Sequence, residues 1–86
     1  MYYIGVKQSG FNVNNLLSEG SAHWVTYFNP DSKLKFQTAK HYNSAGVKAF
    51  DDVQEATAMM DAIKEYGIKG VFVARIANNN TEFIHE

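Results

Sequence analysis

The sequence contains no cysteine, a single proline and almost no net charge. Without cysteine it forms neither disulfides nor thiolate metal sites, and this composition fits the reducing cytoplasm where we expect the protein to act. The formal net charge of −1, from eight basic and nine acidic residues, disfavours a nucleic-acid partner because duplex-DNA binders are normally basic. No run approaches the ~20 apolar residues of a membrane span, so we expect no membrane partner.

Motifs of common catalytic and cofactor sites are also missing. There is no phosphate-binding glycine loop, no dinucleotide fingerprint and no nucleophile elbow. The histidines His23, His41 and His85 lack metal-ligand spacing, although His23 and His41 could approach each other across the ends of a hairpin. We therefore expect no enzymatic activity, no metal and no cofactor. The N-terminal MYYIG lacks the basic and apolar regions of a signal peptide and predicts an immediate strand.

What the sequence does contain is an ordinary globular composition for a short chain. Its 86 residues predict one domain, 1–86, with 45% apolar and 20% charged residues. A chain of this size buries only about 60–65% of its unfolded surface, so its core must be efficient. One tryptophan, five tyrosines and six phenylalanines supply large buried areas for that purpose.

Residues 51–66 are predicted to form an amphipathic helix. Asp51 is expected to cap its start, with Gln54 three residues later as in a capping box, and Gly67 to provide a left-handed exit. Its apolar side chains fall on one stripe at helical spacing. These are Val53, Ala56, Met59, Met60, Ile63 and Tyr66.

The remaining segments favour strands. Residues 2–6 alternate, 23–37 read as a hairpin around an Asn29-Pro30-Asp31-Ser32 turn, and 70–77 are apolar on both faces, as in a central strand. Residues 81–85 could add a short edge strand, whereas 11–19 could be a helical turn or a loop pinned by Phe11 and Leu17. The pattern predicts a small two-layer α+β domain, with a mainly antiparallel sheet of four or five strands and one helix, 51–66, on one face.

The hairpin register decides which side chains face the helix. With a two-residue or four-residue loop, Tyr27 pairs with Leu34 and Val25 with Phe36, and these four apolar side chains face the helix. On the reverse face Trp24 meets Gln37, Phe28 meets Lys33 and Thr26 meets Lys35. Because burying unpaired lysines is costly, that reverse face should be exposed to water.

The sequence therefore predicts an aromatic and basic binding patch on the open face of the sheet. Its members are Trp24, Phe28, Lys33, Lys35, Tyr3, Thr26 and Gln37. Several alternatives stay open: a lone tryptophan is often core, residues 11–19 or a homodimer partner could cover this face, and an odd loop would reverse the faces and bury Trp24.

The stretch FDDVQEATAMMDAIKEYG, followed by a strand, is similar to many short bacterial and phage proteins in which a Phe-Asp pair opens a sheet-covering helix. It covers about a fifth of the chain and carries no functional residues over. Small cysteine-free domains of this style resemble phage accessory or inhibitor proteins. This resemblance implies a viral, phage-like protein that inhibits an enzyme of its host.

Three functions are compatible with these features. The first is a protein-binding module, such as a phage-type inhibitor of a host or defence enzyme, that acts by steric occlusion through the patch; the sequence does not identify its partner. The second is single-stranded nucleic-acid binding, with bases stacked on the same face, which the near-neutral charge disfavours. The third is a structural homo-oligomer in which that face or strand 70–77 pairs between copies.

Overall fold

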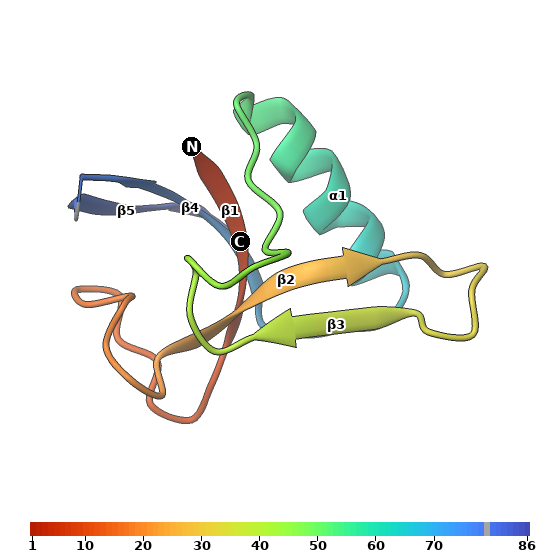
Figure 1. The fold of residues 1–86 in the computed structure, drawn as a ribbon, viewed down its shortest axis with the longest axis horizontal. Helices are drawn as coiled ribbons and strands as arrows, with labels where there is room; N and C mark the ends of the chain where they lie inside the picture. The colour runs from red at the N-terminus through yellow and green to blue at the C-terminus, as the bar shows by residue number, and fades with distance from the viewer. Residues whose placement is uncertain (79) are drawn as a thin grey trace.

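A computed structural model of the chain describes residues 1–78 and 80–86 and contains one helix and a five-stranded sheet (Figure 1). Each pair of neighbouring strands is antiparallel. The elements are β1 (Tyr2–Lys7), β2 (Ala22–Phe28), β3 (Phe36–Ala39), α1 (Val53–Glu65), β4 (Val71–Ala77) and β5 (Asn80–His85). This architecture confirms the predicted α+β class and the predicted order of elements.

The strands lie in the order β3-β2-β1-β4-β5. The apolar segment 70–77 forms β4, which pairs with β1 on one side and β5 on the other, as its two apolar faces predicted. The last segment forms the expected edge strand. The last residue of β5 contacts the helix: the His85 Nε2 atom lies 2.8 Å from the Thr57 hydroxyl, within hydrogen-bond distance.

The N-cap of the helix lies one residue later than predicted. Asp52, not Asp51, is the N-cap, and its carboxylate accepts a hydrogen bond of 2.8 Å from the Gln54 backbone N–H. The helix ends at Glu65 with Tyr66 as its C-cap, and Gly67 follows with φ of 106°, which confirms the predicted left-handed exit. The apolar stripe packs on the sheet except for Tyr66, which is 45% exposed.

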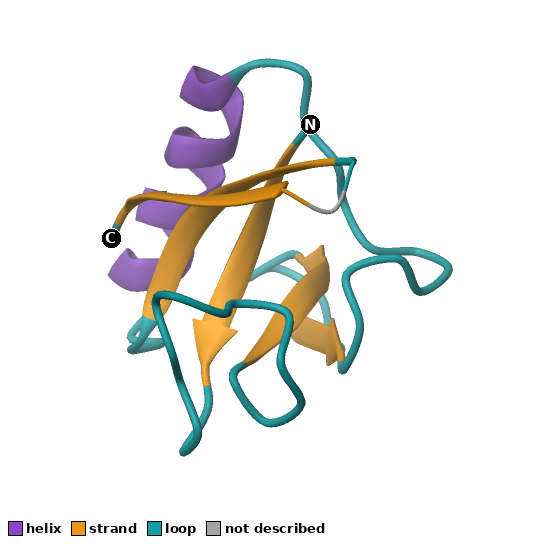
Figure 2. Ribbon diagram, turned by 90° about the vertical axis from the view of Figure 1, so that its left-hand side faces the viewer, coloured by secondary structure: helices purple, strands orange, loops and turns teal. Residues whose placement is uncertain are grey.

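Both faces of the sheet are covered (Figure 2). The helix packs on one face, and long loops cover the other. The helix-side core consists of Ile4, Val25, Ala56, Met60, Ile63, Val71 and Val73. The loop-side core consists of Leu16, Ala22, Trp24, Phe72, Ala74 and Ile76. The second core corrects the expectation that the sheet face opposite the helix is exposed to water, since loops cover it.

The hairpin register differs from the predicted one. Tyr27 pairs with Gln37 and Phe28 with Phe36, because residues 29–35 all belong to the connection between β2 and β3. The predicted turn is present at its start, where the Ser32 N–H donates to the Asn29 carbonyl at 3.2 Å. Leu34 was expected in the core, but it lies in this connection and is 49% exposed.

A β-bulge between Val25 and Tyr27 changes which side chains face the helix. Trp24 and Val25 take the faces predicted for them, with Val25 against the helix and Trp24 on the reverse face. Beyond the bulge the alternation shifts by one residue, so Phe28 packs on the helix-side core. The prediction that Phe28 shares a face with Trp24 is therefore wrong.

Gly5 leaves space for the loop-side core at the centre of the sheet. A Cβ atom at position 5 would lie 2.4 Å from Cζ of Phe72, whose side chain is fully buried. Phe72 in turn contacts the Trp24 ring, with 5.7 Å between centroids and 74° between planes. The absence of a side chain on β1 thus leaves space for the Phe72 ring on β4.

We expect Gly5→Ala to destabilise the protein by about 1–3 kcal/mol through overpacking against Phe72. The entropy that alanine removes from the unfolded chain would offset only about 0.4–1 kcal/mol of this cost. The matched control is Gly46→Ala, which has no atom within 4 Å of the added Cβ and carries only the cost of its φ of 89°. The free energy of unfolding from urea titrations measures both. A Gly5→Ala protein as stable as the wild type would contradict this packing.

Candidate functional site

The predicted patch residues separate into two groups in the structure. Trp24 and Tyr3 lie beneath the loops that cover the sheet, whereas Phe28, Lys33 and Lys35 lie at the far end of β2 and in its connection to β3. The predicted patch is therefore not one continuous surface. The remaining members are Thr26, half-buried at the bulge, and Gln37, exposed on β3.

The prediction that Trp24 is exposed is wrong, because its side chain is only 1% exposed. Residues 11–19 fold over it as a loop with turns, so the alternative that this segment covers the open face is confirmed. Leu16 is also 1% exposed and belongs to the same core, and the Phe11 ring lies 5.5 Å from that of Phe72. The segment is apolar at the positions that touch the sheet, which is why it seals this face.

Hydrogen bonds fasten the covering loop at its base. The Gly10 N–H donates to the Gly20 carbonyl at 3.1 Å, and the Asn12 N–H donates to the Ser21 hydroxyl at 3.0 Å. Ser21 is fully buried, so its hydroxyl is an internal acceptor for the loop backbone. The loop is thereby held on the sheet by polar contacts at its two ends and by apolar contacts in between.

The loop that follows β3 completes the cover on the side of Tyr3. The Tyr3 ring packs edge-on against Trp24, with centroids 6.4 Å apart, and against Tyr42, with centroids 5.4 Å apart. Tyr42 and Val47 belong to this second loop and pack on the loop-side core. Tyr3 is therefore half-buried between the sheet and residues 40–47, and it helps to fix the indole in place.

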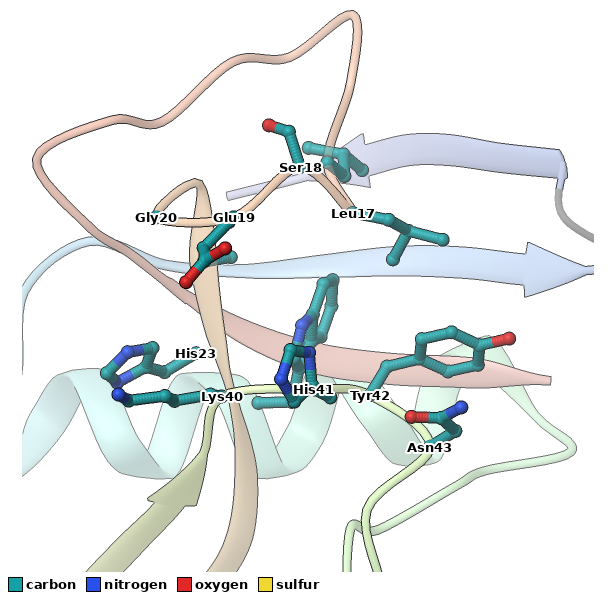
Figure 3. Close-up of a pocket in the computed structure, with 12 residues that line it drawn as sticks. Leu17, Ser18, Glu19, Gly20, His23, Lys40, His41, Tyr42 and Asn43 are labelled. Atoms are coloured by element: carbon teal, nitrogen blue, oxygen red, sulfur yellow. The ribbon is translucent and has the colours of Figure 1, made fainter.

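A cavity of about 370 Å³ remains where the two loops meet the start of β2 (Figure 3). Its apolar side is formed by Leu16, Leu17, Ala22, Trp24 and Tyr42. Its polar side includes Ser18, Glu19, His23, Lys40, His41 and Asn43. The cavity has the size of small-molecule sites in proteins, which are mostly apolar with a few polar groups.

His23 and His41 both line this cavity. No group of three or more histidine, cysteine or acidic side chains able to hold a metal ion occurs in residues 1–78 and 80–86. Likewise, no helix in the described part of the chain is long and apolar enough to cross a bilayer.

A second, shallower hollow of about 290 Å³ lies at the opposite end of β2, against the end of the helix. It is lined by Phe28, Pro30, Ala62, Glu65 and Tyr66. The rings of Phe28 and Tyr66 meet edge-on with centroids 5.9 Å apart, and the Lys35 ammonium lies 6.0 Å from the Tyr66 centroid. Lys35 also donates a 2.9 Å hydrogen bond to the carbonyl of Pro30, one of the lining residues.

We call the exposed end of the hairpin and the adjoining helix terminus the tip surface. It comprises Phe28, Pro30, Lys33, Leu34, Lys35 and Tyr66, and it projects at one end of the molecule (Figure 1). Leu34 and Tyr66 were assigned to the core from the sequence, yet they are 49% and 45% exposed. The sequence pattern missed them because apolar residues in strand-like or helical spacing are usually buried.

Comparisons with known protein families, with curated proteins and with solved structures find no significant match to this chain.

We expect Trp24→Ala to destabilise the protein by about 3–5 kcal/mol, because it empties a large volume in the loop-side core. That loss is comparable to the whole stability of many small domains, so cooperative unfolding should be weakened or lost. Leu34→Ala, at an exposed position, should change stability by less than about 0.5 kcal/mol. Urea titrations followed by far-ultraviolet circular dichroism compare the two variants. A Trp24→Ala protein with wild-type stability would place the indole on the surface.

Proposed function

We propose that this protein is a small protein-binding module that acts by steric occlusion, and that it contacts its partner through the tip surface. The observation that carries the proposal is the exposure of Leu34 and Tyr66 next to Lys33 and Lys35. Such exposed apolar groups mark interaction sites more often than isolated surface residues do.

The composition of the tip surface supports a protein partner. Aromatic side chains and basic residues are enriched among the positions that dominate binding energy in protein interfaces. The Phe28 ring packs edge-on against Tyr66, and this contact lowers the entropy that the Tyr66 ring would lose on binding. Lys33 and Lys35 flank Leu34 in the sequence, and all three are exposed.

The charge of the surface indicates the chemistry of the partner. Lys33 and Lys35 would pair with acidic side chains around an apolar contact that accepts Leu34 and Tyr66. Asp31 and Glu65 at the margin limit the net positive charge, which favours a protein over a nucleic acid. Single-stranded nucleic-acid binding loses support because Trp24, its expected stacking platform, is buried.

Inhibition of a host or defence enzyme in the cytoplasm, as expected of a phage-like protein, is the form of this function that we favour. A projecting hairpin end can occlude a cleft on an enzyme without any chemistry of its own. The resemblance of this small cysteine-free domain to accessory or inhibitor proteins of phages supports this form.

The variant Leu34→Asp/Tyr66→Ser tests the proposal, with Val13→Ser as a control at another exposed apolar position. The wild type and the control should capture the same partner from the cells that produce this protein, identified by mass spectrometry. Titration calorimetry with that purified partner should show binding weakened by about 30-fold or more in the tip variant.

Equal affinity of the tip variant and the wild type would overturn the proposal. Self-association of the wild type in light scattering, lost in the tip variant, would instead identify this surface as a homo-oligomer interface. Both variants alter exposed side chains, so their unfolding should remain cooperative, and a urea titration checks that the fold is retained.

A further inference from the structure

We propose that the cavity beside Trp24 is a binding site for a small flat organic anion, with a carboxylate carried on an aromatic body. The cavity and the tip surface lie at opposite ends of β2, so this site is independent of the proposed protein-binding function. Its lining residues come from the loop before β2, from the start of β2 and from the loop after β3 (Figure 3).

The apolar side of the cavity is preorganised. Leu16 and Trp24 are 1% exposed and Ala22 is 4% exposed, and all three belong to one packed core. The Trp24 ring is fixed by edge-on contacts with Tyr3 and Phe72. These buried side chains support the apolar wall, and a flat ligand would bury its surface mainly against Leu17 and Tyr42, the two half-buried apolar lining residues.

The indole N–H supplies an unsatisfied donor. Within the described residues, Nε1 of Trp24 donates no hydrogen bond to another protein atom. Every side-chain nitrogen or oxygen there that is fully shielded from solvent does have a hydrogen-bond partner. Nε1 must therefore keep an opening to solvent although the residue is 1% exposed. Because Trp24 lines the cavity, we infer that the N–H opens into it, and a ligand there must offer an acceptor.

The rim of the cavity carries several N–H donors. Lys40, His23 and His41 line it, and Glu19 on the facing loop is the one carboxylate among the lining residues (Figure 3). Lys40 forms no ion pair in the part of the chain that the structure describes, where Lys7 and Glu86 make the only salt bridge. A carboxylate can accept from the ammonium and from the indole together, and charge-assisted hydrogen bonds are the stronger kind.

The experiment titrates ¹⁵N-labelled protein with 2-naphthoate and follows the indole N–H signal by NMR. Since the chain has one tryptophan, this signal reports Trp24 alone. Two probes of the same shape serve as comparisons: neutral 2-naphthamide and cationic 2-naphthylmethylamine. We expect a saturable shift with 2-naphthoate and an affinity at least about tenfold weaker for the amide and for the amine.

Lys40→Gln, at an exposed position, should bring the affinity for 2-naphthoate down to that for the amide while leaving the spectrum of the free protein unchanged elsewhere. Lys33→Gln, which removes a lysine at the tip surface, is the matched control and should bind like the wild type. The proposal is overturned by an indole signal that does not shift with 2-naphthoate, by tighter binding of the amine, or by equal affinity for the three probes. An equal loss in both lysine variants would also overturn it, since it would indicate general electrostatic attraction.

Discussion

The packing of the Trp24 indole against Phe72, above the bare backbone of Gly5, is the contact on which the rest of this structure depends. It places the two largest fully buried side chains on the sheet face that the helix does not cover. An 86-residue chain has little surface to bury, so a second core on that face contributes much of the stabilising apolar area. The loops of residues 11–19 and 40–47 are held in place by this core, and they in turn form the walls of the cavity.

The same contact determines where the protein can meet other molecules. With one sheet face under the helix and the other under loops, neither face is available as a broad docking platform. Two exposed apolar side chains, Leu34 and Tyr66, lie instead at the hairpin end and the adjoining helix terminus, where the Tyr66 ring meets that of Phe28. The other end of β2 holds the cavity, in which a buried indole offers its N–H. A partner protein and a small ligand would thus use separate ends of one strand.

Much of the fold could be predicted from periodicity, but the site could not. The helical stripe, the two-sided apolar pattern of 70–77 and the opposite orientations of Trp24 and Val25 follow from local spacing. The bulge at Thr26 and the full 29–35 connection could not be predicted, because nothing local distinguishes Leu34 in a loop from Leu34 in a strand. Residues 11–19 have no periodicity, and only tertiary packing on Trp24 shows that they form a lid over the sheet.

The most direct test of the buried indole is collisional quenching of tryptophan fluorescence, because Trp24 is the only fluorophore of its kind in the chain. A side chain that is 1% exposed beneath two loops should emit at short wavelength and be quenched far less by acrylamide or iodide than free tryptophan. Unfolding in urea should remove that protection. Emission and quenching like those of free tryptophan in the folded protein would contradict the account, because the loops would then not seal the sheet.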